Sequence, residues 1–350
     1  MSKPAAIALM LAALLLAPLR MAAQLGGRSA YQFLNLPLSA QSTALGGKTL
    51  TTDSPALPTV LGNPSLLDSS MHNCIDASYI NYISTLNYGA AVYARRFERI
   101  GMLALGLQQL GYGKFDRINE MGGYEGSFRC HETCLSGIYS TRLDTLVSVG
   151  LTVKMVSSKL ESYWSAGVAL DLGAQYTSRD GTFTAAIALR NAGLMLKSYS
   201  GQRESLPIEL LVGLSKRLQH APLRFMLTLQ QLQNLNMRYR GQQVATIDLM
   251  SGEAQQEGIL RRVGAEALSH LIVGVEITPV PALCVRLGYN HQRRNELAVP
   301  AKGSVVGFSG GIGLNIKKYS FSYSCAMYHL AGFSHHFSVG TNLNRFMNKH

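Results

Sequence analysis

Charge is scarce in this sequence of 350 residues. Charged side chains make up 15% of it, against about 25% in a typical soluble domain. Hydrophobic residues make up 47%, yet the mean hydropathy is only +0.09. That value is too low for a bundle of membrane helices, whereas a sheet with one face on lipid and the other on water averages near it. The composition therefore excludes a helical membrane bundle and is unusual for a soluble domain.

Long apolar runs are also lacking, with one exception at the N-terminus. Residues 5–17 are apolar throughout, about 13 residues where a membrane-spanning helix needs roughly 20. Lys3 precedes this run, and Met-Ala-Ala at residues 21–23 provides small residues for a signal-peptide cleavage site. We predict a signal peptide over residues 1–23, in preference to an uncleaved helical anchor, and hence an exported protein.

Acidic residues are outnumbered by basic ones, which gives a formal net charge of +12. Loss of Lys3 and Arg20 with the signal peptide lowers it by two, to +10. Because an exported protein rarely meets nucleic acid, we expect none as a partner. Anionic outer-membrane lipid or lipopolysaccharide phosphates are the nearer partners. A generally basic loop surface without a specific ligand is the alternative.

The cysteines form no disulfide framework, because their number is odd and their spacing irregular. They are Cys74, Cys130, Cys134, Cys284 and Cys325. Cys130 and Cys134 would lie about 13 Å apart on one extended strand, which is too far for a disulfide. With His131 between them they still lack the second ligand pair of a metal site. We interpret all five as small side chains without a chemical role.

From residue 74 onward, apolar and polar residues alternate repeatedly. In residues 147–155 every odd position is apolar, and every even one is Ser, Gly, Thr or Lys. The same period returns in residues 164–174, 183–189, 208–214, 283–289 and 319–323. A period of two indicates strands with one apolar and one polar face. The segments run about 10 to 14 residues, which suits a tilted membrane strand better than the common strand of 5 or 6.

About fourteen strands account for this pattern, and bacterial outer-membrane barrels have an even number. We expect them to begin near Cys74, Tyr88, Gly101, Ser127, Thr145, Ser162, Gly181, Leu206, Leu223, Arg262, Ala282, Ser304, Lys318 and Gly332. Every second connection is tight, and the others include all the long loops, at residues 113–126, 197–205, 234–260 and 291–303. Such sorting is typical of these barrels, whereas a soluble sandwich has no reason for it. The sequence predicts an all-β fold, a transmembrane antiparallel β-barrel over residues 74–350, located in the outer membrane.

Residues 24–73 do not alternate and contain little strand signal. They hold the pairs Gly26-Gly27 and Gly46-Gly47, several prolines and a short helix-like run at residues 40–45. We predict a plug-like segment, either periplasmic or inserted into the lumen. A disordered linker is the alternative, and the many apolar residues argue against it.

Six charged residues fall on the lumen face by the alternation: Lys154, Asp171, Arg190, Glu209, Glu276 and Arg286. Facing lipid, each would cost roughly 2–4 kcal/mol near the midplane. In the lumen they can pair. They either line a selective channel or form a salt-bridged network that fills a closed lumen, and we favour the network.

No motif indicates an enzyme, a cofactor or a metal. The glycines of residues 310–313 lie inside a strand with no helix after it, so a phosphate loop is excluded by context. His335 and His336 face opposite sides of a strand, which argues against a joint metal site with His329. No nucleophile, base and orienting acid converge at a recognisable spacing. We expect a protein without catalytic residues.

Several segments resemble a known family. They are residues 26–37 (GGRSAYQFLNLP), 44–47 (ALGG), 63–67 (NPSLL), 201–204 (GQRE), 289–294 (YNHQRR) and 328–332 (YHLAG). Together they resemble the PorQ family of type IX secretion outer-membrane proteins across the mature chain, and more distantly PorV and the FadL-type barrels. Those relatives share a plug turn that here is Asn63-Pro64-Ser65. Ser65 replaces the more usual alanine, and Ser205 replaces an expected proline.

The resemblance implies a surface attachment complex. In it a PorZ-like surface protein is held beside PorU and PorV, and secreted cargo is joined to lipopolysaccharide. It implies no catalytic residues. Two functions are compatible with the sequence: a scaffold whose outer loops, chiefly residues 234–260, dock a surface protein, and a FadL-like channel for hydrophobic or small solutes. A soluble sandwich adhesin is a distant third.

Overall fold

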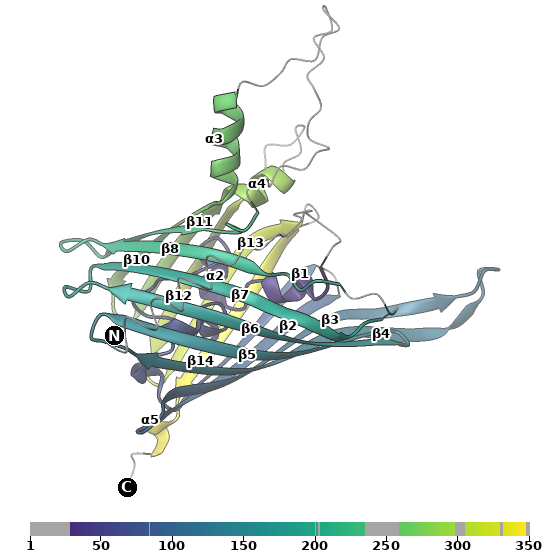
Figure 1. The fold of residues 1–350 in the computed structure, drawn as a ribbon, viewed down its shortest axis with the longest axis horizontal. Coiled ribbons are helices and arrows are strands. Elements are labelled where there is room, and N and C mark those ends of the chain that lie inside the picture. Colours follow the sequence, from purple (N-terminus) through teal and green to yellow (C-terminus); the bar gives the residue numbers. More distant parts are fainter. Residues whose placement is uncertain are drawn as a thin grey trace, which may run out of the picture.

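The computed structural model describes residues 29–83, 85–199, 201, 204–234, 259–297, 305–329 and 332–347. The predicted signal peptide, residues 1–23, lies outside the described residues, and so do residues 235–258 of the predicted docking loop at residues 234–260. In the described part, fourteen antiparallel strands close into a barrel in which the last strand pairs with the first (Figure 1). The predicted fold class is thereby confirmed. The strands are β1 (Cys74–Ile83), β2 (Leu86–Phe97), β3 (Gly101–Ile118), β4 (Tyr124–Arg142), β5 (Val147–Leu160), β6 (Tyr163–Thr177), β7 (Phe183–Lys197), β8 (Glu209–Arg217), β9 (Leu223–Leu229), β10 (Leu271–Val280), β11 (Leu283–Asn290), β12 (Phe308–Ile316), β13 (Tyr319–His329) and β14 (Gly332–Asn342).

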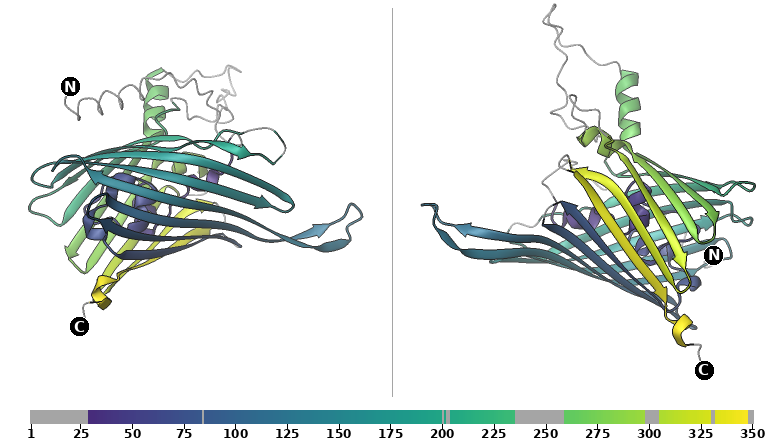
Figure 2. Two further views of the ribbon diagram at one scale, coloured as in Figure 1. Left: turned by 60° about the horizontal axis from the view of Figure 1, so that its bottom comes forward. Right: turned by 180° about the vertical axis from the view of Figure 1, so that it is seen from behind.

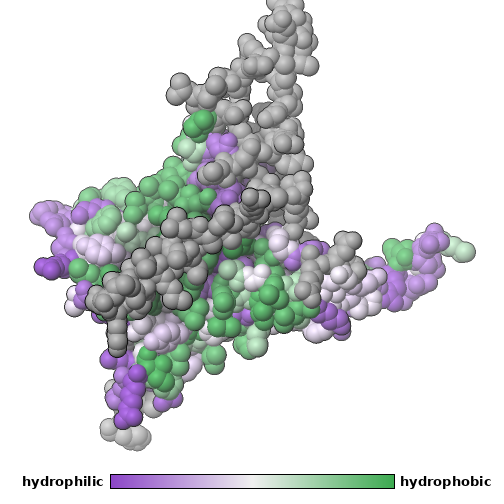
Figure 3. All heavy atoms as spheres, in the orientation of Figure 1, coloured by the Kyte–Doolittle hydropathy of each residue, from purple (hydrophilic) through white to green (hydrophobic). Residues whose placement is uncertain are grey.

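The outer wall of the barrel is apolar. Leu107, Leu135 and Met155 lie side by side on β3, β4 and β5 and are 48%, 49% and 61% exposed. Their strand neighbours on either side point inward and are buried. Figure 3 shows hydrophobic residues over the wall and hydrophilic ones toward its ends. A closed barrel with such a belt satisfies every backbone group of its wall and offers lipid a suitable surface.

The interior is occupied by residues 29–73, which we call the luminal segment. Most of its helices lie within the ring of strands (Figures 1 and 2), and the last, residues 69–71, lies at the end of the barrel with Ser69 and Ser70 exposed. They contact β1 and β2 on one side, β4 to β6 on another and β11 to β14 on a third. The helices are η1 (Gln32–Asn35), α2 (Ala40–Ala44), η2 (Leu57–Leu61), η3 (Pro64–Leu66) and η4 (Ser69–Met71).

The two ends of the barrel differ. Short turns, the start of β1 and the end of β14 lie at one end, with α5 (Asn344–Met347). The other end carries a long extension of β3 and β4 and the helices α3 (Ile259–Ser269) and α4 (His291–Leu297) (Figure 1). By the rule that outer loops are the long ones, we take this second end as the outer end. None of the described helices combines the length and the apolarity that a membrane crossing requires.

Three sequence-based boundaries are corrected by the structure. The strand predicted to begin near Arg262 begins at Leu271, because α3 occupies residues 259–269. The loop predicted at residues 113–126 is mostly strand, since β3 and β4 stay paired as far as Ile118 and Tyr124. The loop predicted at residues 291–303 opens with α4.

Candidate functional site in the barrel lumen

Glu209 on β8 links the luminal segment to the wall. One of its carboxylate oxygens accepts a hydrogen bond from Nζ of Lys48, and the other lies 3.6 Å from Arg190 Nη1 on β7. Arg190 also donates to the backbone oxygen of Leu34, 2.9 Å away. All three charged side chains are largely buried. The node therefore ties two strands of the wall to two points of the luminal segment.

A second node forms where β7 carries a bulge opposite Asp171 on β6. Leu170 pairs with Ala192, but Leu172 pairs with Leu189, so Asp171 faces two residues. One of them, Asn191, adopts a left-handed backbone (φ 56°) and donates its backbone N–H to Asp171 at 2.7 Å. Such bulges redirect side chains in a sheet.

Lys154 on β5 completes this second node. Its Nζ lies 2.5 Å from Asp171 and donates to Asn191 Oδ1 at 2.8 Å. The side chains of Lys154 and Asp171 are 1% and 0% exposed. The side-chain amide of Asn191 donates a hydrogen bond to Oδ1 of Asn35 in the luminal segment, at 2.9 Å. A fully buried ion pair is thus hydrogen-bonded to the segment that fills the lumen.

The third node runs across β9, β10 and β11. Glu276 lies between Arg224 and Arg286 in the register, and its carboxylate accepts from Arg286 Nε at 2.7 Å. Arg224 pairs instead with Asp53 of the luminal segment, which also lies 3.6 Å from Arg217. All six predicted lumen-facing charges therefore lie inside the barrel as ion pairs.

The Asn63-Pro64 turn rests against two glycines of the wall. Gly150 on β5 and Gly173 on β6 are direct cross-strand partners. A Cβ on Gly173 would stand 2.2 Å from Asn63 Oδ1, and one on Gly150 would stand 2.4 Å from the backbone carbon of Pro64. Only glycine allows this approach.

Asn63 is fully buried and holds the turn in shape. Its amide donates to Leu50 O at 3.0 Å, and its Oδ1 accepts from the backbone N–H and the hydroxyl of Ser65 at 3.1 and 2.7 Å. Ser65 in turn accepts at its backbone oxygen from Ser148 of β5. The turn is thus bonded both internally and to the wall.

Burial shifts the pKa values of two charged residues of the luminal segment, Lys48 and Asp53. Burial lowers the pKa of Lys48, against the attraction of Glu209, which raises it. Burial raises the pKa of Asp53, against the attraction of Arg224 and Arg217. In both cases the neutral form is favoured relative to water.

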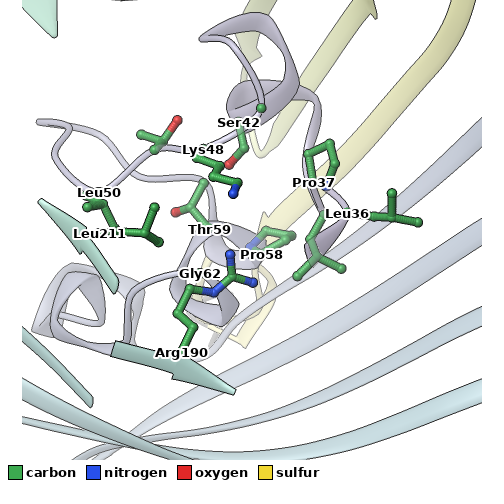
Figure 4. A pocket seen from close by; sticks show the side chains of 13 residues that line it. Leu36, Pro37, Ser42, Lys48, Leu50, Pro58, Thr59, Gly62, Arg190 and Leu211 are labelled. Atoms are coloured by element: carbon green, nitrogen blue, oxygen red, sulfur yellow. The ribbon is translucent and has the colours of Figure 1, made fainter. Parts of the chain in front are cut away.

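A small cavity remains between the luminal segment and the wall. Figure 4 shows Lys48 and Arg190 projecting into it, with Leu50 and Leu211 on one side and Leu36 on the other. It offers about 20 Å³ to the centres of water-sized molecules. That is room for about one water molecule and none for an organic solute.

Sequence reasoning missed Lys48, Asp53 and Asn191. The first two lie in the part of the chain without alternation, so no pattern assigns them a direction. Asn191 enters the lumen through a bulge, which shifts the alternation after Arg190. The two adjacent histidines do obey the alternation: His336 is buried and His335 exposed. Within the described residues, no three or more His, Cys, Asp or Glu side chains gather as a metal site would need.

Comparison with solved structures finds other outer-membrane proteins with a similar fold. The toluene transporter TbuX of Ralstonia pickettii matches with a TM-score of 0.50 and 13% identity, over 88% of this chain and 97% of that one. The toluene transporter TodX of Pseudomonas putida matches with a TM-score of 0.50 and 10% identity, over 87% and 96%. The monoaromatic hydrocarbon channel CymD matches with a TM-score of 0.50 and 12% identity, over 88% and 98%. No protein-family description matches the sequence, and no curated protein matches it.

The fold and its apolar belt define the class of protein. This is a fourteen-stranded outer-membrane β-barrel. Its fold is similar to that of the hydrocarbon channels, and a segment of its own chain packs inside it.

Proposed function

We propose that this barrel is a non-enzymatic scaffold that holds a surface protein at the outer face of the membrane. The observation that supports the proposal best is the filled lumen. Three ion-paired nodes join the luminal segment to strands around the barrel, and the cavity beside it fits about one water molecule. A barrel filled in this way leaves little room for a solute to pass. Its outer rim is then the part that other molecules can contact.

The outer rim carries an element suited to such a role. Residues 113–129 of β3 and β4, which we call the outer ribbon, pair only with each other. β2 pairs with β3 no further than Gly111, and β5 pairs with β4 no further than Cys130. The ribbon projects well beyond the other strands (Figures 1 and 2). Its free edges can accept a strand from another chain, which is a common mode of recognition.

We base the proposed partner on the family resemblance of the sequence. The PorQ-like segments of the sequence imply a PorZ-like surface protein, with PorU and PorV in the same complex, and a role in attaching secreted cargo to lipopolysaccharide. The scaffold function is compatible with that assembly, because a surface protein can dock on the outer end of a membrane-anchored barrel whether or not the lumen is open.

The test removes the outer ribbon and leaves the barrel closed. Residues 113–129 are replaced by Asn-Gly, a tight hairpin turn, so that Tyr112 and Cys130 are joined across it. We expect the surface partner to be lost from washed outer membranes while the barrel keeps its heat-modifiable mobility on gels. As the control, residues 219–221 at the opposite end are replaced by the same dipeptide. Full retention of the partner without the ribbon contradicts the ribbon as its site.

A second candidate function is transport of a hydrophobic solute. It is favoured by the likeness to TbuX, TodX and CymD, whose names describe toluene and monoaromatic hydrocarbon transport. In this case the luminal segment would have to move to open a path. Uptake of radiolabelled toluene by vesicles containing the barrel, above that of empty vesicles, would support this candidate against the scaffold.

A further inference from the structure

The lipid-facing wall carries a group of basic side chains at one place on its outer rim. On β4, β5 and β6, His131 pairs with Lys159, and Lys159 pairs with Trp164. On β7, the ammonium of Lys197 lies over the Trp164 ring, 4.5 Å from its centre. Trp164 is the only tryptophan of the chain and is 45% exposed. We call these four residues the rim cluster.

The rim cluster faces outward, away from the lumen. In β5 the odd residues Val153 and Met155 are exposed, while Lys154 and Val156 between them are buried. Lys159 continues the odd, exposed row. Trp164 donates its indole N–H to Ser157 of the same outer face, at 3.0 Å. The cluster therefore stands on the surface that lipid contacts.

The apolar belt begins directly below the rim cluster. Met155 lies four residues from Lys159, about 13 Å along the strand. On β6 and β7 the exposed Leu170, Leu194 and Leu196 continue the belt. Cationic groups at the outer edge of an acyl-chain surface stand where the headgroups of the outer leaflet lie.

Two acidic groups on the strands and turn beside the rim cluster are engaged elsewhere. Glu161, in the turn between β5 and β6, lies 2.5 Å from Arg117 of the outer ribbon. Glu132, on β4, is buried on the lumen side and accepts a hydrogen bond from Tyr112. Arg129 adds a further exposed cation on β4. Arg129, Lys159 and Lys197 therefore give this part of the outer wall three exposed cations.

We propose that the rim cluster binds the phosphorylated headgroup of an outer-leaflet glycolipid, with Lys159 and Lys197 on its phosphate and the acyl chains along the belt below. The Lys197 ammonium lies over the Trp164 ring, and Lys159 is the cross-strand neighbour of Trp164. Amphipathic aromatic side chains prefer this depth of the membrane. The lysines stand two strands apart, roughly 10 Å, which suits phosphate groups spread across one headgroup. This site depends on the barrel being in a membrane and not on the scaffold function, so each can fail without the other.

Because Trp164 is the only tryptophan, its fluorescence reports this site directly. The full-length mature barrel in neutral detergent is titrated with diphosphoryl lipid A while Trp164 emission is followed. We expect the Lys159→Ala/Lys197→Ala variant to bind about tenfold more weakly than the wild type. The Lys159→Arg/Lys197→Arg variant, which keeps the charge, is expected to bind like the wild type.

The control uses a similar pair at the other end of the barrel. Nζ of Lys318 lies over the ring of Phe346, 4.3 Å from its centre. The Lys318→Ala variant should leave the lipid A titration unchanged. Lipid A without phosphates should bind as weakly to the wild type as diphosphoryl lipid A does to the double alanine variant. Heat-modifiable mobility confirms that each variant is folded.

Three results would overturn the proposal. The first is equal binding by the wild type and the double alanine variant. The second is equal binding of lipid A with and without its phosphates. The third is a response to inorganic phosphate at the same concentration as to lipid A, which would indicate a free-anion site and no lipid site.

Discussion

A single methyl group added to Gly173 should loosen the luminal segment. The added Cβ would stand 2.2 Å from Asn63 Oδ1 and 3.1 Å from Pro64 Cδ, so the turn must move away from β6. Overpacking of this kind typically costs about 1–3 kcal/mol. Displacement of Asn63 also weakens its three hydrogen bonds to Leu50 and Ser65, at about 0.5–1.5 kcal/mol each when lost. We expect Gly173→Ala to destabilise the lumen-bound state of the segment by about 2 kcal/mol.

Trypsin cleavage after Lys48 measures this change. The Lys48 side chain is 12% exposed and bound to Glu209, so cleavage requires the segment to leave its site. When opening is fast, the cleavage rate follows the population of the open state, and about 2 kcal/mol corresponds to roughly a thirtyfold rate increase. The matched control is Gly137→Ala, where a Cβ meets nothing within 4 Å. Equal cleavage of Gly173→Ala and wild type would refute the proposed packing of the turn.

Three further predictions concern the groups that hold the segment. Lys154→Met and Asp171→Leu should each cost about 3–5 kcal/mol in urea unfolding, and the double variant less than either; additive losses would contradict a mutually dependent pair. Asn63→Ala should cost about 1–3 kcal/mol in the same assay, and a neutral effect would show that the turn needs no internal bonds. Because burial lowers the pKa of Lys48 below 10.5, the unfolded chain binds more protons between the folded value and 10.5, so stability should rise with pH in that window. Lys48→Met should lose this slope, and an unchanged slope would assign it to other groups.

The alternation of the sequence was sufficient to predict the barrel wall. Each strand has lipid on one face and the lumen on the other, so its pattern depends only on its own residues. Strands predicted to begin at Cys74, Gly101, Leu223 and Gly332 do begin there. The prediction failed for α3 because Arg262 follows a long stretch without alternation, where no pattern fixes a strand start.

The outer ribbon was missed because its order depends on pairing rather than on burial. Phe115 and Phe128 lie opposite each other across the ribbon and stack with ring centres 5.5 Å apart. Gly113 and Gly126, at the two ends of the predicted loop, are residues typical of turns, and the stretch was therefore predicted as a loop. A contact between two residues 13 positions apart produces no pattern in the sequence of either strand alone.

The candidate site was predicted in part. The lumen-facing side of Lys154 or Glu209 follows from strand parity, but the partner of each depends on the register between strands. Lys48 and Glu209, which are bonded to each other, are 161 positions apart in the sequence. Gly150 and Gly173, which contact the Asn63-Pro64 turn, look in the sequence like any other small residues on the polar face of a strand. Such contacts are defined only when the barrel closes around the segment.

The scaffold function is tested most directly by isolating the tagged full-length protein from gently solubilised outer membranes and identifying its companions by mass spectrometry. The proposal predicts recovery of a large surface protein with PorU-like and PorV-like companions, at ratios that survive washing. A barrel that is recovered alone from membranes in which those proteins are present would contradict it.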